Sequence, residues 1–419
     1  MTVGLALPGS PRVITFGCRL NAVQSQAIRE QAADDLAGAV VFNTCAVTAE
    51  AVRQARQAIR RARREQPEAR LIVTGCAAQI NPETFAHMDE VDLVVGNTWR
   101  PDAFAREGPR VRVGDILTEG QTPPGVSGLA GRARAYVAIQ NGCDHRCTFC
   151  VIPYGRGNSR SQSPEAVIRQ VQAMTDQGIR EVVLTGVDLT SWGADLEDRA
   201  SLGDLVARIL ANVPALPRLR LSSIDAAEID ERLLGMMGSE PRLMPHLHLS
   251  LQSGDDLILK RMKRRHSRAD ALGLIAAVRR VRPETAFGAD FIAGFPTESE
   301  AAFENTLGLV AEAGLAFLHV FPYSARPGTP AARMPQNSTE LVHARARRLC
   351  AAGEVALAGH LESKLGAQIT ALVEREGRAR AEDFTEVSFE GAAGPGDLIV
   401  GEIVAHDGAR AHLGDWRLA

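Results

Sequence analysis

Three closely spaced cysteines limit what this chain can fold into more than any other feature does. Cys143, Cys147 and Cys150 form a C-x3-C-x2-C pattern within residues 140–161. A [4Fe-4S] cluster usually takes four thiolates, and no fourth cysteine follows nearby. The pattern therefore predicts an iron–sulfur cluster in which one iron lacks a protein ligand and is free to bind another molecule.

Two other interpretations of these cysteines stay open. A structural zinc site normally needs four ligands, and His145, at an unusual spacing, is the candidate for the fourth. Disulfides are the remaining alternative. Residues 1–11 contain neither a basic start nor a cleavage site, so we expect no secretory signal and a cytoplasmic protein. Thiols in that compartment bind metals more often than they form disulfides.

The length and composition set the class of protein. A chain of 419 residues is expected to form two or three domains. Hydrophobic residues make up 45% of it, and no apolar run approaches the roughly 20 residues of a membrane helix, so no membrane partner is expected. The net charge is −3 and the pI about 6.4, which gives no overall attraction to nucleic acid. Any RNA binding would come from local basic patches.

A second set of cysteines lies in residues 1–127. Cys18, Cys45 and Cys76 each end an apolar stretch that reads as a buried parallel strand, at residues 13–18, 39–45 and 71–76. Helices are expected at 22–37 and 50–65. Because ligands gather at the carboxyl ends of parallel strands, we expect the three thiols to converge and to hold another cluster with an open iron. The alternative is three buried free cysteines, which are common in protein cores.

Residues 128–360 alternate strands with helices. Six such units fit a partial (β/α)6 barrel, with its chemistry at the carboxyl ends of the strands. The expected strands are 135–139, 181–186, 219–223, 247–251, 286–292 and 317–321. The expected helices are 164–177, 201–212, 227–237, 255–262, 268–281, 299–313 and 338–363. Residues 106–127 read as the linker before this domain, and Cys350 as a small core residue.

Residues 361–419 change to short alternating strands with glycine turns. Strands are expected at 368–374, 384–389, 397–404 and 411–413, which predicts a small β-barrel. Small barrels are common oligonucleotide platforms, although the same architecture also serves as a structural cap.

Two basic runs are candidates for RNA contact. The denser one predicts contact with the RNA backbone, and the alternative is an exposed helix end; it consists of Lys260, Arg261, Lys263, Arg264 and Arg265. The other is a row of six arginines between positions 53 and 64, for which a solvated helix face is an equal alternative.

The cysteine motifs resemble a known family. The C-x3-C-x2-C pattern, with Phe149 before its last cysteine, resembles the radical S-adenosylmethionine (SAM) enzymes. Segments 15–21, 43–48 and 73–79 look like the N-terminal domain of the methylthiotransferases in that superfamily. Branches of this family modify isopentenyladenosine in tRNA, threonylcarbamoyladenosine in tRNA, or an aspartate of a ribosomal protein. Residues 91–97 and the segment after Cys45 are most similar to the bacterial threonylcarbamoyladenosine branch.

The resemblance implies three domains: an N-terminal cluster domain (1–127), a radical SAM domain (128–360) and an RNA-binding TRAM-like barrel (361–419). It implies two [4Fe-4S] clusters, one on each set of three cysteines, and SAM bound near Phe149, Gly186, Ser250 and Gln252, although polar residues on strands can simply satisfy the barrel interior. The implied partners are a tRNA anticodon loop and a one-electron donor such as a flavodoxin or ferredoxin, with the sulfur donor unassigned. A non-catalytic RNA-binding protein with structural metal is the alternative from another class.

Overall fold

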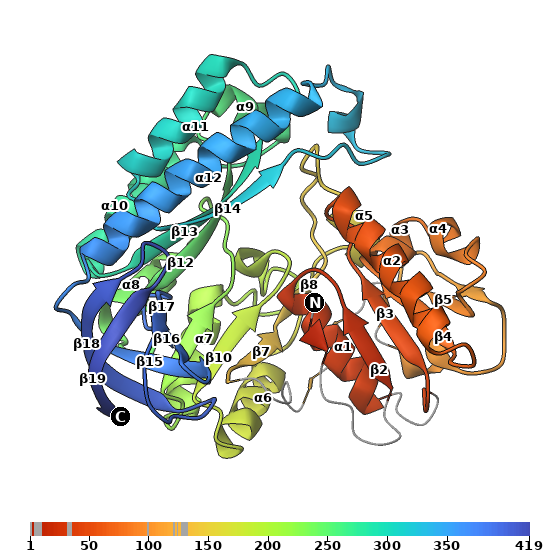
Figure 1. Cartoon of the computed structure of the whole chain (residues 1–419), viewed down its shortest axis with the longest axis horizontal. Coiled ribbons are helices and arrows are strands. Elements are labelled where there is room, and N and C mark those ends of the chain that lie inside the picture. Colours follow the sequence, from red (N-terminus) through yellow and green to blue (C-terminus); the bar gives the residue numbers. More distant parts are fainter. Residues whose placement is uncertain are drawn as a thin grey trace.

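Three units make up the computed structural model, which describes residues 2–3, 11–31, 36–98, 100–119, 122–123, 125–126 and 133–419. In Figure 1 the N-terminal unit lies to the right in red and orange, the large barrel lies in the centre and upper left, and the small barrel lies at the lower left in blue. The predicted domain boundary at residues 127 and 128 falls outside the described residues. Among the described residues, no helix is both long and apolar enough to cross a membrane.

The N-terminal unit is a six-stranded sheet in the order β1-β2-β3-β4-β5-β6, in which β1 is antiparallel and the other strands are parallel. Alternate residues of β3, such as Val41 and Phe42, belong to different hydrophobic clusters, so both faces of the sheet are covered. The strands are β1 (Thr2–Val3), β2 (Arg12–Thr15), β3 (Val40–Thr44), β4 (Leu71–Gly75), β5 (Leu93–Val95) and β6 (Val111–Arg112). The helical segments are α1 (Arg19–Gln31), α2 (Ala49–Glu65), α3 (Cys76–Ile80), α4 (Glu83–Ala86) and η1 (Pro101–Phe104).

The order of these strands decides where the cysteines meet. β2, β3 and β4 are direct neighbours in the sheet, and neighbouring strands lie about 5 Å apart. The turns that follow the three strands therefore lie side by side at one edge.

The central unit is an open barrel of two three-stranded parallel sheets, β11-β10-β7 and β12-β13-β14, joined by a bridge between Ile224 and Leu249. This confirms the predicted six-stranded partial barrel. Its strands are β7 (Ala135–Ala138), β10 (Glu181–Thr185), β11 (Arg218–Leu221), β12 (His246–Gln252), β13 (Ala286–Ala293) and β14 (Phe317–Pro322). A short hairpin, β8 (Gln140–Asn141) with β9 (Arg160–Ser161), leads into the cysteine loop.

Helices cover the outside of the barrel (Figure 1). Ser163 caps α6 and Pro164 is its first residue, as the sequence predicts. The predicted helix 227–237 is wrong at its start, because Asp230 caps a helix that begins at Glu231. The helical segments are α5 (Ile152–Arg156), α6 (Pro164–Asp176), η2 (Leu189–Ser191), α7 (Leu202–Asn212), α8 (Glu231–Ser239), α9 (Asp256–Met262), α10 (Arg268–Val281), α11 (Glu300–Glu312), η3 (Pro330–Arg333) and α12 (Thr339–Glu362).

The C-terminal unit is a closed five-stranded barrel in the order β15-β16-β17-β19-β18. One strand of this barrel, β16, was not predicted from the sequence. The predicted start of β17 is too early, because Phe384 adopts a left-handed conformation with φ of 74°. The strands are β15 (Gln368–Arg375), β16 (Arg378–Ala381), β17 (Glu386–Ser388), β18 (Leu398–His406) and β19 (Ala411–Leu418).

A buried charge network fixes this small barrel to the large one. The carboxylate of Glu181 at the start of β10 pairs with Arg134, Arg218 and Arg220. Arg220 also donates to the backbone oxygen of Ala381, and Arg134 pairs with Glu374 in β15. Because these charges are buried, they are stable only when all partners are present, so the network holds the two barrels in one arrangement.

Candidate metal centres

Cys18, Cys45 and Cys76, here called the N-terminal triplet, follow three neighbouring strands. Cys18 lies in the turn after β2, Cys45 directly after β3, and Cys76 opens α3 directly after β4. Cys45 and Cys76 are buried, and Cys18 is exposed. The thiols are close enough to interact electrostatically, since Cys76 and Cys18 both contribute to the pKa of Cys45. The structure therefore brings together three residues that are up to 58 positions apart in the sequence.

Two glycines make this convergence possible. Gly17 has φ of 90°, and a Cβ atom there would lie 2.7 Å from the Sγ atom of Cys45. Gly75 has φ of 93°, and a Cβ atom there would lie 2.4 Å from Oδ1 of Asn43. Any other residue would combine backbone strain with a clash at both positions, so these glycines are part of the site.

Polar side chains that the sequence analysis missed surround the N-terminal triplet. Asn21 donates to the backbone oxygens of Phe16 and Thr44, which fastens the first two cysteine turns together. Asn97 donates to Sγ of Cys76 at 3.4 Å. Asn21 lies three residues after Cys18 in the sequence, whereas Asn97 lies 21 residues after Cys76 and reaches it only through the fold.

A buried cation from the barrel lies beside this triplet. Burial raises the pKa of Cys45 to about 12 and also raises the pKa of Cys76. The guanidinium of Arg156, from α5, acts against that shift at both thiols. Thiols of high pKa stay protonated until a metal displaces the proton. Three convergent thiols beside a buried cation therefore fit a metal centre that carries negative charge.

Cys143, Cys147 and Cys150, here called the barrel triplet, lie in the loop after β8. The backbone N–H of Ile152 donates to Sγ of Cys150 at 3.4 Å, and Arg264 donates to Sγ of Cys147 at 3.7 Å. Burial, followed by the charge of Asp188, raises the pKa of Cys143 above its usual range. The three thiols and the N–H donors aimed at them fit a cluster that is held by three thiolates.

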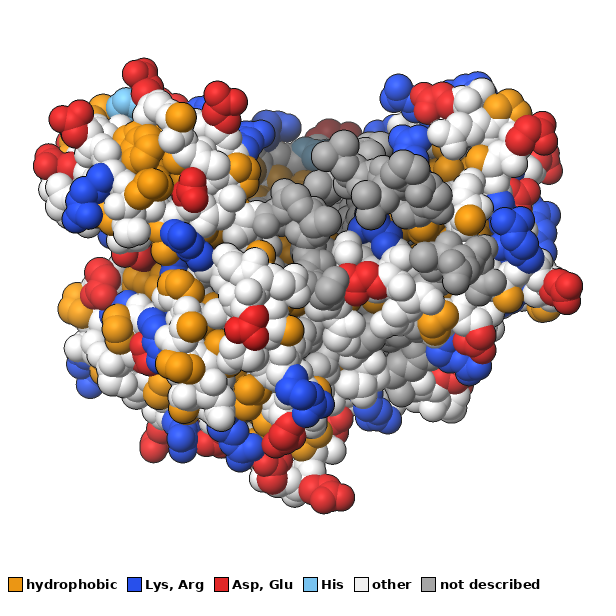
Figure 2. Space-filling view, turned by 90° about the horizontal axis from the view of Figure 1, so that it is seen from below, with side chains coloured by type: hydrophobic (Ala, Val, Ile, Leu, Met, Phe, Trp, Pro, Cys, Tyr) orange, Lys and Arg blue, Asp and Glu red, His pale blue; other side chains and the backbone are white. Residues whose placement is uncertain are grey.

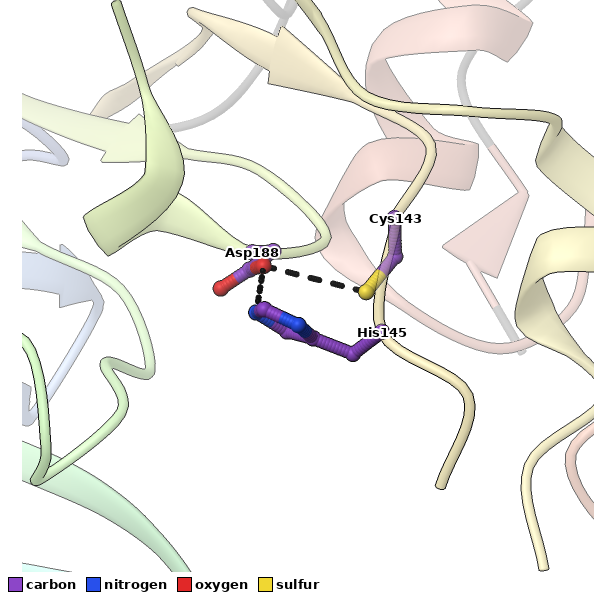
Figure 3. Close-up of side chains that lie close together, drawn as sticks. All are labelled: Cys143, His145 and Asp188. Atoms are coloured by element: carbon purple, nitrogen blue, oxygen red, sulfur yellow. Dashed lines mark hydrogen bonds and ion pairs between the residues drawn. The ribbon is translucent and has the colours of Figure 1, made fainter. Parts of the chain in front are cut away.

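His145 and Asp188 complete the surroundings of Cys143 (Figure 3). Asp188, in the loop after β10, points its carboxylate at both neighbours, with Oδ2 2.8 Å from Nε2 of His145 and 3.7 Å from Sγ of Cys143. The hydrogen bond to Asp188 raises the pKa of His145. His145 therefore groups with Cys143 and Asp188, which differs from a zinc site built on all three cysteines. All seven cysteines are free thiols, so the disulfide alternative is wrong.

Two cavities that share Val47, Thr48 and Phe321 in their linings lie beside the triplets. One, of about 940 Å³, is lined by Cys18, Cys45 and Gly186, together with residues of β12, β14 and the C-terminal barrel. The other, of about 230 Å³, is lined by Val47 and Thr48 from the Cys45 turn on one side and by Cys150 on the other. Cys18 and Cys45 of the N-terminal triplet and Cys150 of the barrel triplet thus face the space between the N-terminal unit and the large barrel.

Three of the four residues predicted to bind SAM line these cavities. Phe149 and Gln252 line the smaller cavity, and Gly186 lines the larger one. Gln252 has φ of 70° next to an irregularity in the pairing of β12 with β13. The backbone oxygen of Ser250 accepts a hydrogen bond from Arg264. Their contact with SAM stays a prediction.

The basic run at the end of α9 divides into two parts. Lys260 and Lys263 are exposed, as contact with RNA requires. Arg264 is instead inside the barrel, where it pairs with Asp225 at 2.7 Å and 8% of its side chain is exposed. Arg265 pairs with Glu228, and Arg261 donates to Thr297. The five residues were predicted to form one surface, because nothing in the local sequence indicates the carboxylates that pair with Arg264 and Arg265.

The arginine row on α2 is largely paired. Four of its six arginines face acidic groups: Arg53 with Glu50, Arg60 with Glu90, Arg61 with Glu65, and Arg63 with Asp92. On the side of the molecule shown in Figure 2, acidic and basic side chains are interspersed. Cys350, predicted to be a core residue, is exposed on α12 and lines the larger cavity, because the neighbouring Leu349 faces the barrel instead.

Comparisons with known proteins identify the family. Residues 137–310 match the model of the radical SAM superfamily, and residues 11–96 match that of the uncharacterized protein family UPF0004. The chain is 45% identical to the threonylcarbamoyladenosine tRNA methylthiotransferase MtaB of Rickettsia prowazekii, over 94% of both chains. It is 35% identical to the protein of the same name from Aquifex aeolicus, over 92% of this chain and 98% of that one.

A solved structure supports the fold. The cobalamin-dependent SAM radical enzyme OxsB superposes with a TM-score of 0.50 at 12% identity, over 83% of this chain and 56% of that one. Members of the radical SAM superfamily hold a [4Fe-4S] cluster and SAM. From the extent and level of identity to its curated relatives, this chain belongs to the methylthiotransferase family of radical SAM enzymes that modify tRNA.

Proposed function

We propose that this enzyme adds a methylthio group to C2 of N6-threonylcarbamoyladenosine next to the anticodon of tRNA. The observation that carries the proposal is that cysteines of both triplets line cavities between the N-terminal unit and the large barrel, and that these cavities share Val47, Thr48 and Phe321. The names of the curated relatives support the choice of nucleoside.

The six clustered cysteines would hold two [4Fe-4S] clusters. The barrel triplet would hold the cluster that binds SAM, and the N-terminal triplet would hold the second. The clusters and SAM, when bound, supply the one-electron reduction, the radical that removes hydrogen from C2, and the methylthio sulfur. An external one-electron donor of the flavodoxin or ferredoxin class would provide the electron.

The chain itself positions the reactants and excludes water. Phe149 packs edge to face on Phe295, with ring centroids 6.4 Å apart, and forms an apolar wall of the smaller cavity. Gln252 and Asp290 present polar groups to the same cavity. Positioned groups in a water-poor cavity lower the entropy cost of reaction and protect a reactive intermediate.

Substrate tRNA would approach from the surface that carries Lys260 and Lys263, with the C-terminal barrel as a second contact. An anticodon loop is single-stranded, so its bases can be unstacked into a cavity without breaking a duplex. Arg264 would act inside the barrel instead, because it is buried and Asp225 already pairs with it. The charge of Arg265 is already paired with Glu228, and Arg261 donates to Thr297.

The test is an anaerobic incubation of the reconstituted enzyme with SAM, a reductant and one of three tRNAs, followed by mass spectrometry of the nucleosides. The tRNAs carry threonylcarbamoyladenosine, isopentenyladenosine or unmodified adenosine at the same position. We expect the 2-methylthio derivative of the first alone. Product from isopentenyladenosine only would move the enzyme to that branch. If no 2-methylthio nucleoside forms and an aspartate of a ribosomal protein is methylthiolated instead, tRNA is not the substrate. If the protein contains only zinc and does not cleave SAM, the proposal that it is a radical SAM enzyme is wrong.

A further inference from the structure

Arg156 is a buried cation without an acidic partner. Its side chain is 2% exposed, and none of the carboxylates in the described part of the chain lies within ion-pair distance of it. Its hydrogen bonds go to the neutral amides of Asn141, at 3.0 Å, and Asn21. Burial of an unbalanced charge is costly, so the fold must supply negative charge at this position.

The groups that can supply it are the thiols of the N-terminal triplet. Burial by itself would lower the pKa of Arg156, but Cys76, Cys18 and Cys45 outweigh that effect and raise it. The contacts of Arg156 lead to the same sulfurs: Oδ1 of Asn21, which accepts from the guanidinium, lies 4.0 Å from Sγ of Cys18. Arg156 is therefore placed to act as a counter-ion to negative charge on the three sulfurs.

The chain around Arg156 is built to hold it there. A Cβ atom on Gly155 would lie 3.2 Å from Cβ of Cys76, so α5 packs directly against the start of α3. Asn97 donates both to the backbone oxygen of Gly155, at 2.5 Å, and to Sγ of Cys76. The arginine thus comes from the barrel, six residues after Cys150, while the thiols come from the N-terminal unit.

We propose that Arg156 is the counter-cation of the cluster on the N-terminal triplet, a positioning residue whose buried charge favours additional negative charge on that cluster. The inference rests on the proposed function, because it requires a cluster at this triplet. Reduction potentials of iron–sulfur clusters depend on nearby charge and on hydrogen bonds to sulfur. Removal of a buried cation therefore makes reduction less favourable.

The test is a redox titration of the full chain in which Cys143, Cys147 and Cys150 are replaced by alanine, so that only the N-terminal cluster is read by electron paramagnetic resonance. We expect R156Q to lower the equilibrium constant for reduction at least tenfold, which is about 59 mV for one electron. R156K keeps the charge and should give a smaller shift. R146Q is the matched control, since Arg146 is an exposed arginine of the neighbouring loop that donates to the backbone of Cys143 and His145 and to the side chain of Asn158.

A second variant removes the charge without removing the side chain. In N141D, a carboxylate replaces the amide that Arg156 already contacts, so it neutralises the guanidinium with little change of shape. We expect the same downward shift as in R156Q. If R156Q binds no iron, the test is the reduction potential of the N-terminal cluster in N141D. A potential equal to that of the parent protein overturns the inference. A lower potential or a loss of the cluster supports it. A parent protein without iron at this triplet would instead refute the proposed second cluster.

Discussion

The barrel triplet and the N-terminal triplet each present three cysteine sulfurs, but the charged groups around the two triplets differ. Around the barrel triplet, His145, Arg264 and Arg265 each face a carboxylate. Around the N-terminal triplet, Arg156 faces amides and thiols. The first centre is thus embedded in balanced charge, and the second in a net positive environment. One ligand set can therefore be tuned for two tasks by what surrounds it.

The largest effects should come from removing each triplet in turn. Replacement of Cys143, Cys147 and Cys150 by alanine should abolish formation of 5′-deoxyadenosine and of product. Replacement of Cys18, Cys45 and Cys76 should abolish product but leave 5′-deoxyadenosine formation at the same order of magnitude. Iron should fall from about eight to about four atoms per chain in both variants.

Iron analysis and chromatography of the nucleosides provide the measurements. Loss of 5′-deoxyadenosine formation from both variants, each with four irons retained, would mean that the two centres do not divide the reaction as we expect.

Gly17→Ala should damage the N-terminal centre selectively. The new methyl group would lie 2.7 Å from Sγ of Cys45 in a backbone conformation that L-residues rarely adopt. We expect roughly half of the iron to be lost, while cleavage of SAM at the barrel triplet continues. The matched control is Gly38→Ala, which has φ of 73° but no atom within 4 Å of the added methyl group. An equal loss of iron from the two variants would show that backbone strain, and not the clash with Cys45, is what matters. Full iron content in both would contradict the role assigned to Gly17.

Arg264 and Asp225, the ion pair beside the barrel triplet, should make coupled contributions to the free energy of unfolding. Arg264→Gln or Asp225→Asn alone leaves a buried charge unpaired and should lower the free energy of unfolding by about 3 kcal/mol. The double variant should lose less than the sum of the two, because neither charge then remains. Urea unfolding of the three variants measures the coupling. Simple additivity would indicate that the pair does not neutralise itself as its 2.7 Å contact implies.

The smallest effect should come from the surface. K260Q/K263Q removes two exposed charges and should weaken tRNA binding by less than about tenfold. The slope of log K against log salt concentration should become shallower by about 1.5 units. Arg53→Gln, whose guanidinium already pairs with Glu50 at 2.6 Å, is the control and should leave both unchanged. Filter binding at several salt concentrations checks this, and a larger loss from Arg53→Gln would place the tRNA on α2 instead.

Much of the architecture could be predicted, because apolar runs and helix-capping residues depend only on neighbouring positions in the sequence. Apolar runs located β3, β4 and β10 within one or two residues, and Ser163 with Pro164 located the start of α6. The prediction failed where a local pattern was ambiguous. The left-handed conformation of Phe384 delays the start of β17 to Glu386. Cys350, predicted to lie in the core, lies on the exposed side of α12.

The sequence alone determined which sulfurs belong to which triplet, because each cysteine ends a strand or lies within a short motif, and both signals are written in neighbouring residues. Only the tertiary structure decided the charge that each triplet experiences. Arg156 and Arg264 look alike in the sequence, but one is buried against thiols and the other against Asp225. Charge compensation depends on which distant groups share a low-dielectric interior, and that is set by the packing of domains rather than by any local pattern.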